Sequence, residues 1–331
     1  MAHAAGMPTR ILTRADLDGL APMTDIVEAV EGAFRAHAEG KTQMPPKVYL
    51  SLPEHSGDFR AMPSKMEGAA GIKWVSSHQK NPADFNLPAV MGVFVLSNPE
   101  NAFPLAILDG TLLTALRTGA SAGVASRHLA KEAPQVVGFV GCGVQARFLH
   151  AAHEAVYGQT FEVLCADHRE VAAEGFAAEL SAKGWKARAV SAEEAAGAAI
   201  VNTTTPGRSL AVKDAWVKDG AHINAIGADA PGKQELESAL VKRAKVVIDE
   251  THQASHSGEI NVPLHDGVIT ATDLAGTIGQ VIVGAAKVDR SALTVFDSTG
   301  LAVQDLALAK LLYDLAEKKG VGTSVDLIGA G

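Results

Sequence analysis

Four cations stand in segments whose patterns otherwise predict half-buried strands or an apolar helix. Arg60 and Lys73 lie in DFRAM and GIKWVSS, Lys47 follows a Pro-Pro pair, and Arg117 follows Thr-Ala-Leu. A buried cation is costly unless it meets an anion, so these side chains either extend to solvent or await a negatively charged partner. Arginine suits two-point recognition of a carboxylate, and lysine supplies a point charge. We therefore expect the four to bind a substrate carboxylate, with solvated surface positions as the alternative.

A proton carrier is expected in the segment AIGADAPGKQELE, which follows a predicted strand. Asp229 lies there between Gly227 and the Pro231-Gly232 pair. A desolvated carboxylate at the carboxyl end of a strand could have a raised pKa and act as a general acid and base. The alternative is a turn residue whose side chain bonds its own backbone.

The segment GCGVQA predicts a dinucleotide site, because it follows the apolar run VVGFV and opens a helical pattern. Gly141 permits a tight turn, Gly143 lets the backbone approach a pyrophosphate, and Ala146 allows close helix–strand packing. Val144 and Gln145 begin the helix, whose free N–H groups favour phosphate. A glycine-rich turn without a ligand is the alternative.

Two further positions are expected to contact the dinucleotide. Asp167 ends the next predicted strand, where a carboxylate can accept the ribose hydroxyls of NAD and repel the 2′-phosphate of NADP. His168 and Arg169 follow directly, so NADP remains possible. Thr203 and Thr204 end a later strand at the ligand-binding edge of such sheets, with a simple polar loop as the alternative.

The elements that must position these residues fall into two groups. The N-terminal part predicts a helix over 24–40, with Asp25 and Glu28 as a capping box, followed by a meander of strands punctuated by Gly, Pro and Asn. From residue 135, apolar strands alternate with helices, which predicts a parallel, doubly wound sheet buried on both faces. A final amphipathic helix over 303–318 can pack back on the first group.

Composition excludes several functional classes. The 331 residues carry a net charge of −8 with scattered cations, which disfavours nucleic acid as a partner. We expect no transmembrane helix, because the apolar runs fall short of a membrane span. Cys142 and Cys165 form no disulfide framework and are read as packing residues of a cytoplasmic protein.

Histidine pairs give no convincing metal site. His150, His153 and Glu154 share a helix face but do not form H-E-x-x-H, and His252 with His256 lacks a third ligand. We therefore expect no metal.

Together these residues resemble the ornithine cyclodeaminase/μ-crystallin family over nearly the whole chain. The segments that carry the resemblance are MPPKVYL, RAMP, GIKWVSSHQKNP, TALRTGASA, GCGVQA, GADAPGKQEL and DSTGLAVQDLALAKLLY. The resemblance implies a homodimer and an α/β fold in which a Rossmann domain (128–303) is inserted in a discontinuous α+β substrate and dimerisation domain (1–127 plus 304–331).

The resemblance also assigns roles to residues. It implies that Lys73 and Arg117 hold the substrate carboxylate, that Lys47 stands where arginine is common, and that Asp229 is catalytic. Positions that help to bind the cofactor in this family correspond to Thr118, Lys233 and Ser298.

One departure bears on the reaction. Where the cyclodeaminase branch has glutamate before its Met-Pro, this chain has Arg60, which would repel a substrate ammonium and attract a carboxylate. The chain is thus more similar to the alanine dehydrogenase-like branch. We expect an NAD(H)-dependent oxidoreductase that interconverts a small L-amino acid and its 2-oxo acid through an imine. A cyclodeaminase of ornithine or lysine, a cyclic ketimine reductase and a non-catalytic NAD(P)H-binding protein stay open, as do the substrate side chain and assembly beyond a dimer.

Overall fold

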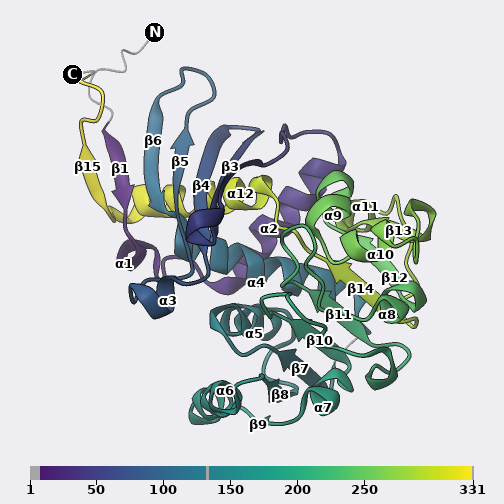
Figure 1. Ribbon diagram of the computed structural model, residues 1–331. Helices are drawn as coiled ribbons and strands as arrows, with labels where there is room; N and C mark the ends of the chain where they lie inside the picture. The colour runs from purple at the N-terminus through teal and green to yellow at the C-terminus, as the bar shows by residue number, and fades with distance from the viewer. Residues whose placement is uncertain (1–7, 132–133, 330–331) are drawn as a thin grey trace. The chain divides into compact units, whose positions relative to one another are not determined.

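A computed structural model describes residues 8–131 and 134–329 of the chain (Figure 1). Contacts between Cα atoms divide it into two compact units. The first contains the described residues up to Arg117 together with those from Leu301 onward, and the second runs from Thr118 to Gly300. The expected α/β class, with a doubly wound domain and a second α+β domain, is confirmed.

The first unit is built on a sheet with two main helices. Its elements are β1 (Thr9–Leu12), α1 (Arg14–Leu17), α2 (Met23–Ala38), β2 (Val48–Leu52), the 3₁₀ turn Pro53–His55, β3 (Gly57–Met66), β4 (Ala69–His78), α3 (Asn81–Asp84), β5 (Val90–Ser97), β6 (Pro104–Asp109), the start of α4 (Gly110–Leu129), α12 (Ala302–Lys319) and β15 (Thr323–Val325).

The sheet of this unit has seven strands in the order β15-β1-β6-β5-β4-β3-β2. The run from β2 to β6 is the antiparallel meander that the sequence predicts, and β1 joins its far edge parallel to β6. Side chains alternate between the two faces along each strand. We call the face covered by α12 and α2 the inner face, since α12 contacts α2, β3, β4 and β5 (Figure 1).

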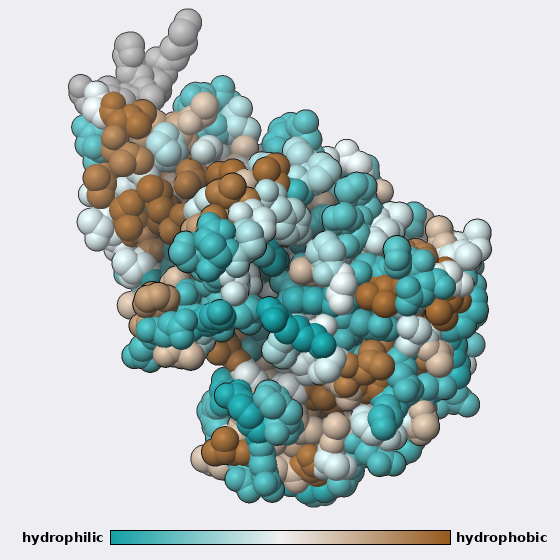
Figure 2. All heavy atoms as spheres, viewed as in Figure 1, coloured by the Kyte–Doolittle hydropathy of each residue, from teal (hydrophilic) through white to brown (hydrophobic). Residues whose placement is uncertain are grey.

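The opposite face of this sheet, the outer face, is apolar and open in the described chain. Five apolar side chains on this face alternate with inner-face residues and are each more than one third exposed: Val48, Leu50, Ile72, Trp74 and Val93. Brown, hydrophobic spheres gather over the strands of this sheet in Figure 2. An exposed apolar patch of this kind marks an interaction surface.

The second unit alternates strands and helices. Its elements after α4 are β7 (Val136–Val140), α5 (Val144–Tyr157), β8 (Glu162–Ala166), α6 (Glu170–Ala182), β9 (Ala187–Ala189), α7 (Ala192–Ala196), β10 (Ile200–Thr203), the 3₁₀ turn Asp214–Trp216, β11 (His222–Ala225), α8 (Ser238–Arg243), β12 (Lys245–Ile248), α9 (Thr251–Ser257), α10 (Asn261–His265), the 3₁₀ turn Ala271–Asp273, β13 (Leu274–Thr277), α11 (Ile278–Ile282) and β14 (Thr294–Asp297).

The sheet of the second unit has eight strands in the order β13-β12-β14-β11-β10-β7-β8-β9, and all its strand pairs are parallel. The strand order reverses between β7 and β10. In open α/β sheets, ligands bind at the carboxyl ends of the strands at such a switch point. The loops after β7 and β10 are therefore the expected binding loops of this unit.

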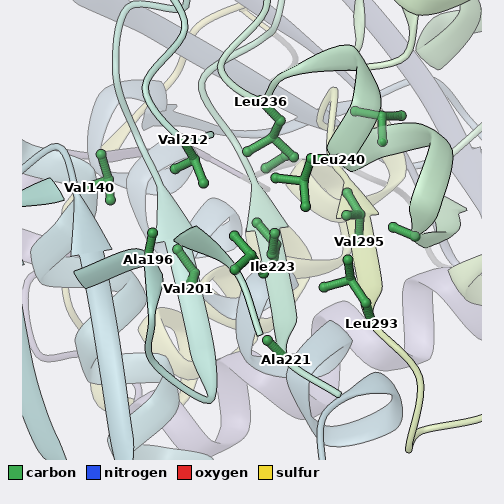
Figure 3. Close-up of a cluster of buried hydrophobic side chains, with 14 of the residues drawn as sticks. Val140, Ala196, Val201, Val212, Ala221, Ile223, Leu236, Leu240, Leu293 and Val295 are labelled. Carbon is green, nitrogen blue, oxygen red and sulfur yellow. The ribbon is translucent and has the colours of Figure 1, made fainter. Parts of the chain in front are cut away.

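Both faces of this sheet are covered, as its continuous apolar strands predict. Val201, Ile223 and Val295 belong to the cluster on one face (Figure 3), and Val163 and Phe139 belong to the cluster on the other. The two free cysteines lie buried in the second cluster, so their expected packing role is confirmed.

Small residues in α4 explain the TGASAG segment. A Cβ at Gly119 would lie 2.3 Å from the carbonyl oxygen of Phe148, and one at Gly123 would lie 3.1 Å from Cβ of Ala152. Both neighbours belong to α5, so the small residues let two helices of the second unit approach closely.

The cap of α2 and the limits of the two units differ from the expectations. The capping box of Asp25 with Glu28 is wrong, because α2 begins after Pro22 and its N-cap makes no side-chain hydrogen bond. The expected domain limits at 127/128 and 303/304 also differ from the contact-based limits, which fall within α4 and just before α12. No loop marks the first limit, because α4 is continuous. None of the described helices is long and apolar enough to cross a membrane.

Candidate active site

Lys73 is buried on the inner face of the first unit. Its side chain is 1% exposed, and its Nζ atom lies 2.8 Å from each carboxylate oxygen of Asp305 in α12. Nζ also donates to the hydroxyl of Thr114 at 3.2 Å. Burial lowers the pKa of Lys73 to about 7, because desolvation and the nearby charges of Arg117 and Lys47 outweigh the attraction of Asp305.

Arg117 shares the same carboxylate. Its Nε atom donates to Oδ1 of Asp305 at 3.2 Å, and the Asp305 side chain is 0% exposed. One buried carboxylate thus stands between two expected substrate cations, and we call Lys73, Arg117 and Asp305 the cation cluster. Its three charges sum to +1 when Lys73 is protonated, which leaves a positive charge for an incoming carboxylate.

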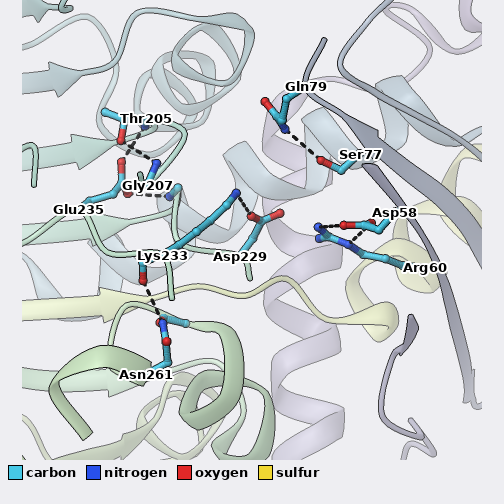
Figure 4. A network of polar contacts seen from close by, with 12 residues as sticks. Asp58, Arg60, Ser77, Gln79, Thr205, Gly207, Asp229, Lys233, Glu235 and Asn261 are labelled. Atoms are coloured by element: carbon cyan, nitrogen blue, oxygen red, sulfur yellow. Dashed lines mark hydrogen bonds and ion pairs between the residues drawn. The ribbon is translucent and has the colours of Figure 1, made fainter. Parts of the chain in front are cut away.

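Arg60 lies on the same face of the sheet as Lys73. Arg60 pairs with Val75 across the β3–β4 ladder, two positions from Lys73, so both point to the inner face. Arg60 already meets an anion, however, because Nε and Nη2 donate to the two oxygens of Asp58 at 2.8 and 3.1 Å (Figure 4). Its guanidinium also lies over the ring of Tyr49. A substrate carboxylate at Arg60 would share this fork with Asp58.

Lys47 lies just before β2 and is only partly buried. It is close enough for its charge to lower the pKa of Lys73. The first unit therefore brings the charges of three expected substrate residues together, with Arg60 on the same face.

The glycine loop of the second unit is shaped for a phosphate group. Gly141 has a φ of +100°, and a Cβ there would lie 2.8 Å from the carbonyl carbon of Thr204, so glycine is required. A Cβ at Gly143 would face open space. The N-cap of α5 makes no side-chain hydrogen bond, which leaves N–H groups at the helix start for an anion.

The other motif residues occupy the start of α5. Ala146 is fully buried and Val144 is exposed. Oε1 of Gln145 is a buried acceptor without a hydrogen-bond partner in the described chain. An orphaned polar atom beside an uncapped helix start fits a bound group with donors of its own. The loop therefore fits a dinucleotide.

Asp167 follows β8 and is tied to the glycine loop. Its oxygens accept from the backbone N–H groups of Cys142 and Arg169 at 2.8 and 2.9 Å. His168 Nδ1 lies 3.1 Å and Arg169 Nε 3.8 Å from the carboxylate. The carboxylate is thus in place next to the loop, with the imidazole of His168 and the guanidinium of Arg169 at its side.

Thr203 and Thr204 both engage the protein. The Thr203 hydroxyl donates to Oε2 of Glu235 at 2.6 Å, and that of Thr204 donates to the carbonyl of Gly141 at 2.8 Å. The two side chains hold the loop after β10, so any contact with a dinucleotide would use their remaining polar atoms.

Asp229 and Lys233 form an ion pair on the loop after β11. Nζ of Lys233 donates to Oδ1 of Asp229 at 2.6 Å (Figure 4). The Asp229 side chain is 35% exposed, so the expected desolvation of this carboxylate is not observed. A partly exposed carboxylate on a loop at the carboxyl edge of the sheet remains able to exchange protons.

Thr118 and Ser298 are buried positions of the second unit. Thr118 lies in α4, and Ser298 follows β14, where its N–H donates to the carbonyl of Ala225 at 3.1 Å.

Sequence reasoning missed three acidic residues that organise these sites. Asp305 lies in the segment DSTGLAVQDLALAK and Glu235 in GADAPGKQEL, both carriers of the family resemblance, and Asp58 precedes Arg60 by two positions on the same strand face. The i, i+2 spacing of Asp58 and Arg60 was a readable signal. Nothing local indicated the partners of Asp305 or Glu235.

The histidines take structural positions. His150 and His153 are buried beside Phe139, and His150 packs edge-on to Trp185 at 4.4 Å. In the described part of the chain, no group of three or more His, Cys, Asp and Glu residues could hold a metal ion.

Known proteins of one family are similar to this chain over nearly its whole length. Residues 7–320 match the model of the ornithine cyclodeaminase/mu-crystallin family. An alanine dehydrogenase of Archaeoglobus fulgidus is 48% identical over 96% of this chain and 98% of its own length.

Two solved structures are also similar to this chain over nearly its whole length. An archaeal alanine dehydrogenase dimer with bound NAD is 48% identical and superposes with a TM-score of 0.93, covering 97% of this chain and all of its own. The Δ¹-pyrroline-2-carboxylate reductase of Thermococcus litoralis, in complex with NADH and L-proline, is 35% identical with a TM-score of 0.92, covering 96% of this chain and all of its own.

Proposed function

This chain belongs to the ornithine cyclodeaminase/mu-crystallin family, and we propose that it is an NAD(H)-dependent oxidoreductase that interconverts a small L-amino acid and its 2-oxo acid. Alanine and pyruvate are the simplest pair, as the name of the Archaeoglobus fulgidus relative suggests. The dinucleotide supplies or accepts the hydride when it is bound.

One observation carries the substrate class. Lys73 and Arg117 are buried around the single carboxylate of Asp305, so the cation cluster retains a positive charge inside the protein when Lys73 is protonated. A substrate carboxylate balances that charge, and in a buried setting the attraction is stronger than in water. Lys47 adds positive charge near Lys73, which supports an anionic substrate over one that carries a second ammonium group. The charge of Arg60 is balanced by Asp58, so Arg60 contributes donors that a substrate carboxylate would share.

Residues of the second unit take the cofactor roles. The loop of Gly141 and Gly143 and the start of α5 hold the pyrophosphate, and Asp167 accepts the ribose hydroxyls. The carboxylate favours NAD over NADP through repulsion of a 2′-phosphate. Thr118, Lys233 and Ser298 complete the proposed cofactor site.

Asp229 is the proposed proton carrier. Formation of an imine from a 2-oxo acid and ammonia releases water, and the carbonyl oxygen must gain protons as it leaves. Asp229 gives and takes these protons, and Lys73, when protonated, polarises the C2 carbonyl by binding the carboxylate beside it.

We further propose that the chain forms a homodimer through the outer face of the first unit's sheet. The relative with 48% identity was solved as a dimer, and the outer face exposes Trp74, Val93 and Leu50. Covering such a face with a second copy removes apolar surface from water. The two free thiols fit a reducing cytoplasm, which is the proposed location of the protein.

Substrate turnover tests the proposal. Purified protein with NADH, ammonia and pyruvate should lose absorbance at 340 nm, and Asp229→Asn should lower kcat by about 100-fold or more while NADH still binds. No oxidation of NADH with any of a panel of 2-oxo acids would overturn it. Tight NADH binding without turnover, unchanged by Asp229→Asn, would indicate a binding protein instead.

A second candidate is a reductase of cyclic ketimines, which the Thermococcus litoralis relative supports. Such an enzyme would reduce Δ¹-pyrroline-2-carboxylate without added ammonia. Parallel assays with this imine and with pyruvate plus ammonia separate the two reactions. Release of ammonia from ornithine with only catalytic NAD, yielding proline, would instead identify a cyclodeaminase.

A further inference from the structure

Buried carboxylates line the edge of the second unit's sheet where the cofactor and proton-carrier loops begin. Glu235, Glu259, Asp297 and Asp249 are each 2% exposed or less. Their acceptor atoms are used chiefly by backbone N–H groups of the loops after β10, β11, β12 and β14. Buried carboxylates are retained only when donors satisfy them.

Glu235 is the member of this group that joins two loops. Oε1 accepts from the N–H of Thr205 at 2.7 Å (Figure 4). Oε2 accepts from the hydroxyl of Thr203 at 2.6 Å and from the N–H of Gly227 at 2.7 Å. A Cβ at Gly227 would lie 2.6 Å from Oε1, so glycine is needed for this approach. The Gly227 contact also closes the loop 227–235, which carries Asp229.

The same loop is fixed at its other end. The Asn261 side chain accepts from the N–H of Gly232 and donates to the carbonyl of Lys233, both at 2.9 Å. Lys233 in turn bonds Asp229. The proton carrier therefore stands on a loop tied at both ends, and its position depends on Glu235.

Glu235 is itself held by the next carboxylate. Glu259 accepts from the N–H groups of Glu235 and Leu236 at 3.0 and 2.7 Å, and Asp297 accepts from the N–H groups of Glu259 and Ile260 at 2.9 and 3.1 Å. Burial raises the pKa of Glu235 and Glu259, and burial together with Asp249 raises that of Asp297 to about 8. A proton held by Asp297 at neutral pH lowers the repulsion along this row.

We propose that Glu235 is a positioning residue for the reaction, which holds the loop of Asp229 against the loop of Thr203 and Thr205. This inference rests on the proposed function. Catalytic groups must be placed to within a fraction of an ångström, and a displacement of about 1 Å can cost about 100-fold in rate. Glu235 is fully buried and its oxygens already accept from three protein donors, so its loss should act on kcat through Asp229.

The test is Glu235→Gln. The amide keeps the size of the side chain but has one acceptor oxygen, so at least one of the three donors then faces an NH₂ group. We expect kcat to fall about 10- to 100-fold, KM for the 2-oxo acid to change less than threefold, and backbone N–H exchange in peptides containing Thr205 and Gly227 to accelerate at least tenfold.

Glu237→Gln is the matched control. Glu237 lies outside the loop 227–235, is the N-cap of α8 and accepts from the N–H of Asp214 at 2.8 Å. We expect unchanged kcat and unchanged exchange at Thr205 and Gly227. Thr203→Val is the second variant, since it removes one donor to Glu235 and keeps the side-chain shape. It should lower kcat about threefold or more with KM nearly constant, and it decides the matter if Glu235→Gln does not fold.

The outcomes separate this inference from the proposed function. Hydrogen exchange is measured without substrate, so it reports on the loop even if the wild-type protein turns over none of the tested acids. Unchanged exchange in Glu235→Gln would overturn the inference, as would faster exchange with kcat within twofold of wild type in an active enzyme.

Discussion

Nζ of Lys73 in β4 lies 2.8 Å from Asp305 in α12, although the two residues are 232 positions apart in sequence, and both side chains are buried. The contact joins the sheet of the first unit to the helix that covers it. It also places an anion between two cations that would otherwise repel each other.

Asp305→Asn tests how much that contact contributes to the free energy of unfolding. Removing one partner of a buried pair leaves uncompensated charge, so we expect a loss of about 3–5 kcal/mol in the free energy of unfolding. Denaturant titration measures this loss. The control is Asp314→Asn on the same helix, whose pair with Lys310 is partly exposed and should contribute about 0–1 kcal/mol. Equal effects of the two substitutions would contradict the role of Asp305.

Carboxylate binding should depend on pH through Lys73. Its folded pKa is about 7 against an ordinary 10.5, so the ammonium form is lost as pH rises through 7. The dissociation constant of oxamate, an unreactive analogue of pyruvate, should therefore increase by up to about tenfold between pH 6 and 8. In Lys73→Met, binding should be weaker and nearly constant over this range, and a retained pH dependence would assign the effect to another group.

Lys73 should also make the free energy of unfolding depend on pH. Because folding lowers its pKa, the unfolded chain binds more protons between pH 7 and 10.5. The contribution of Lys73 to the free energy of unfolding is therefore complete above pH 10.5 and is lost as the pH falls toward 7. Comparing wild type with Lys73→Met by thermal unfolding at pH 7 and 9 should show that wild type gains relative stability at the higher pH.

Arg60 and Asp58 should have opposite effects on substrate binding. If the guanidinium is shared between Asp58 and the substrate carboxylate, Asp58→Asn releases it and should lower KM for pyruvate about two- to fivefold. Arg60→Met should raise KM about tenfold or more. NADH affinity, measured by fluorescence, should stay the same in both. Parallel loss of pyruvate and NADH binding in Arg60→Met would make Arg60 structural.

The outer face of the first unit should carry the dimer contact. Trp74→Glu places a charge on this face and should shift the protein from dimer to monomer in sedimentation experiments. Val171→Glu is the control, because Val171 is equally apolar but lies exposed on α6 of the second unit. A dimer that persists with Trp74→Glu would place the interface elsewhere.

The buried imidazole of His153 should make the protein sensitive to acid. Burial lowers its pKa to about 4, while the unfolded chain binds a proton near pH 6.5. The contribution of His153 to the free energy of unfolding is thus complete above pH 6.5 and is lost as the pH falls toward 4. Between pH 7 and 5, wild type should lose about 2 kcal/mol more unfolding free energy than His153→Gln. The control is the solvent-exposed His168→Gln.

Much of the fold was predictable because its signals are local. The alternating strands of the meander, the apolar strands of the parallel sheet and the last helix follow from side-chain periodicity within a few residues. Three short strands, β1, β13 and β15, were missed. The predicted capping box of α2 failed because Pro22, not Asp25, precedes the first residue of the helix.

The sequence by itself determined the residues with chemistry and, for the glycine loop, their geometry. Gly141, Gly143 and Ala146 act through a turn and a helix start that the same six residues form. The tertiary structure decided which charges are already balanced. Asp305 reaches Lys73 and Arg117 from a distant helix, and Glu235 ties loops that follow separate strands. Such partners are set by packing between remote segments, and a single sequence carries no local signal for that packing.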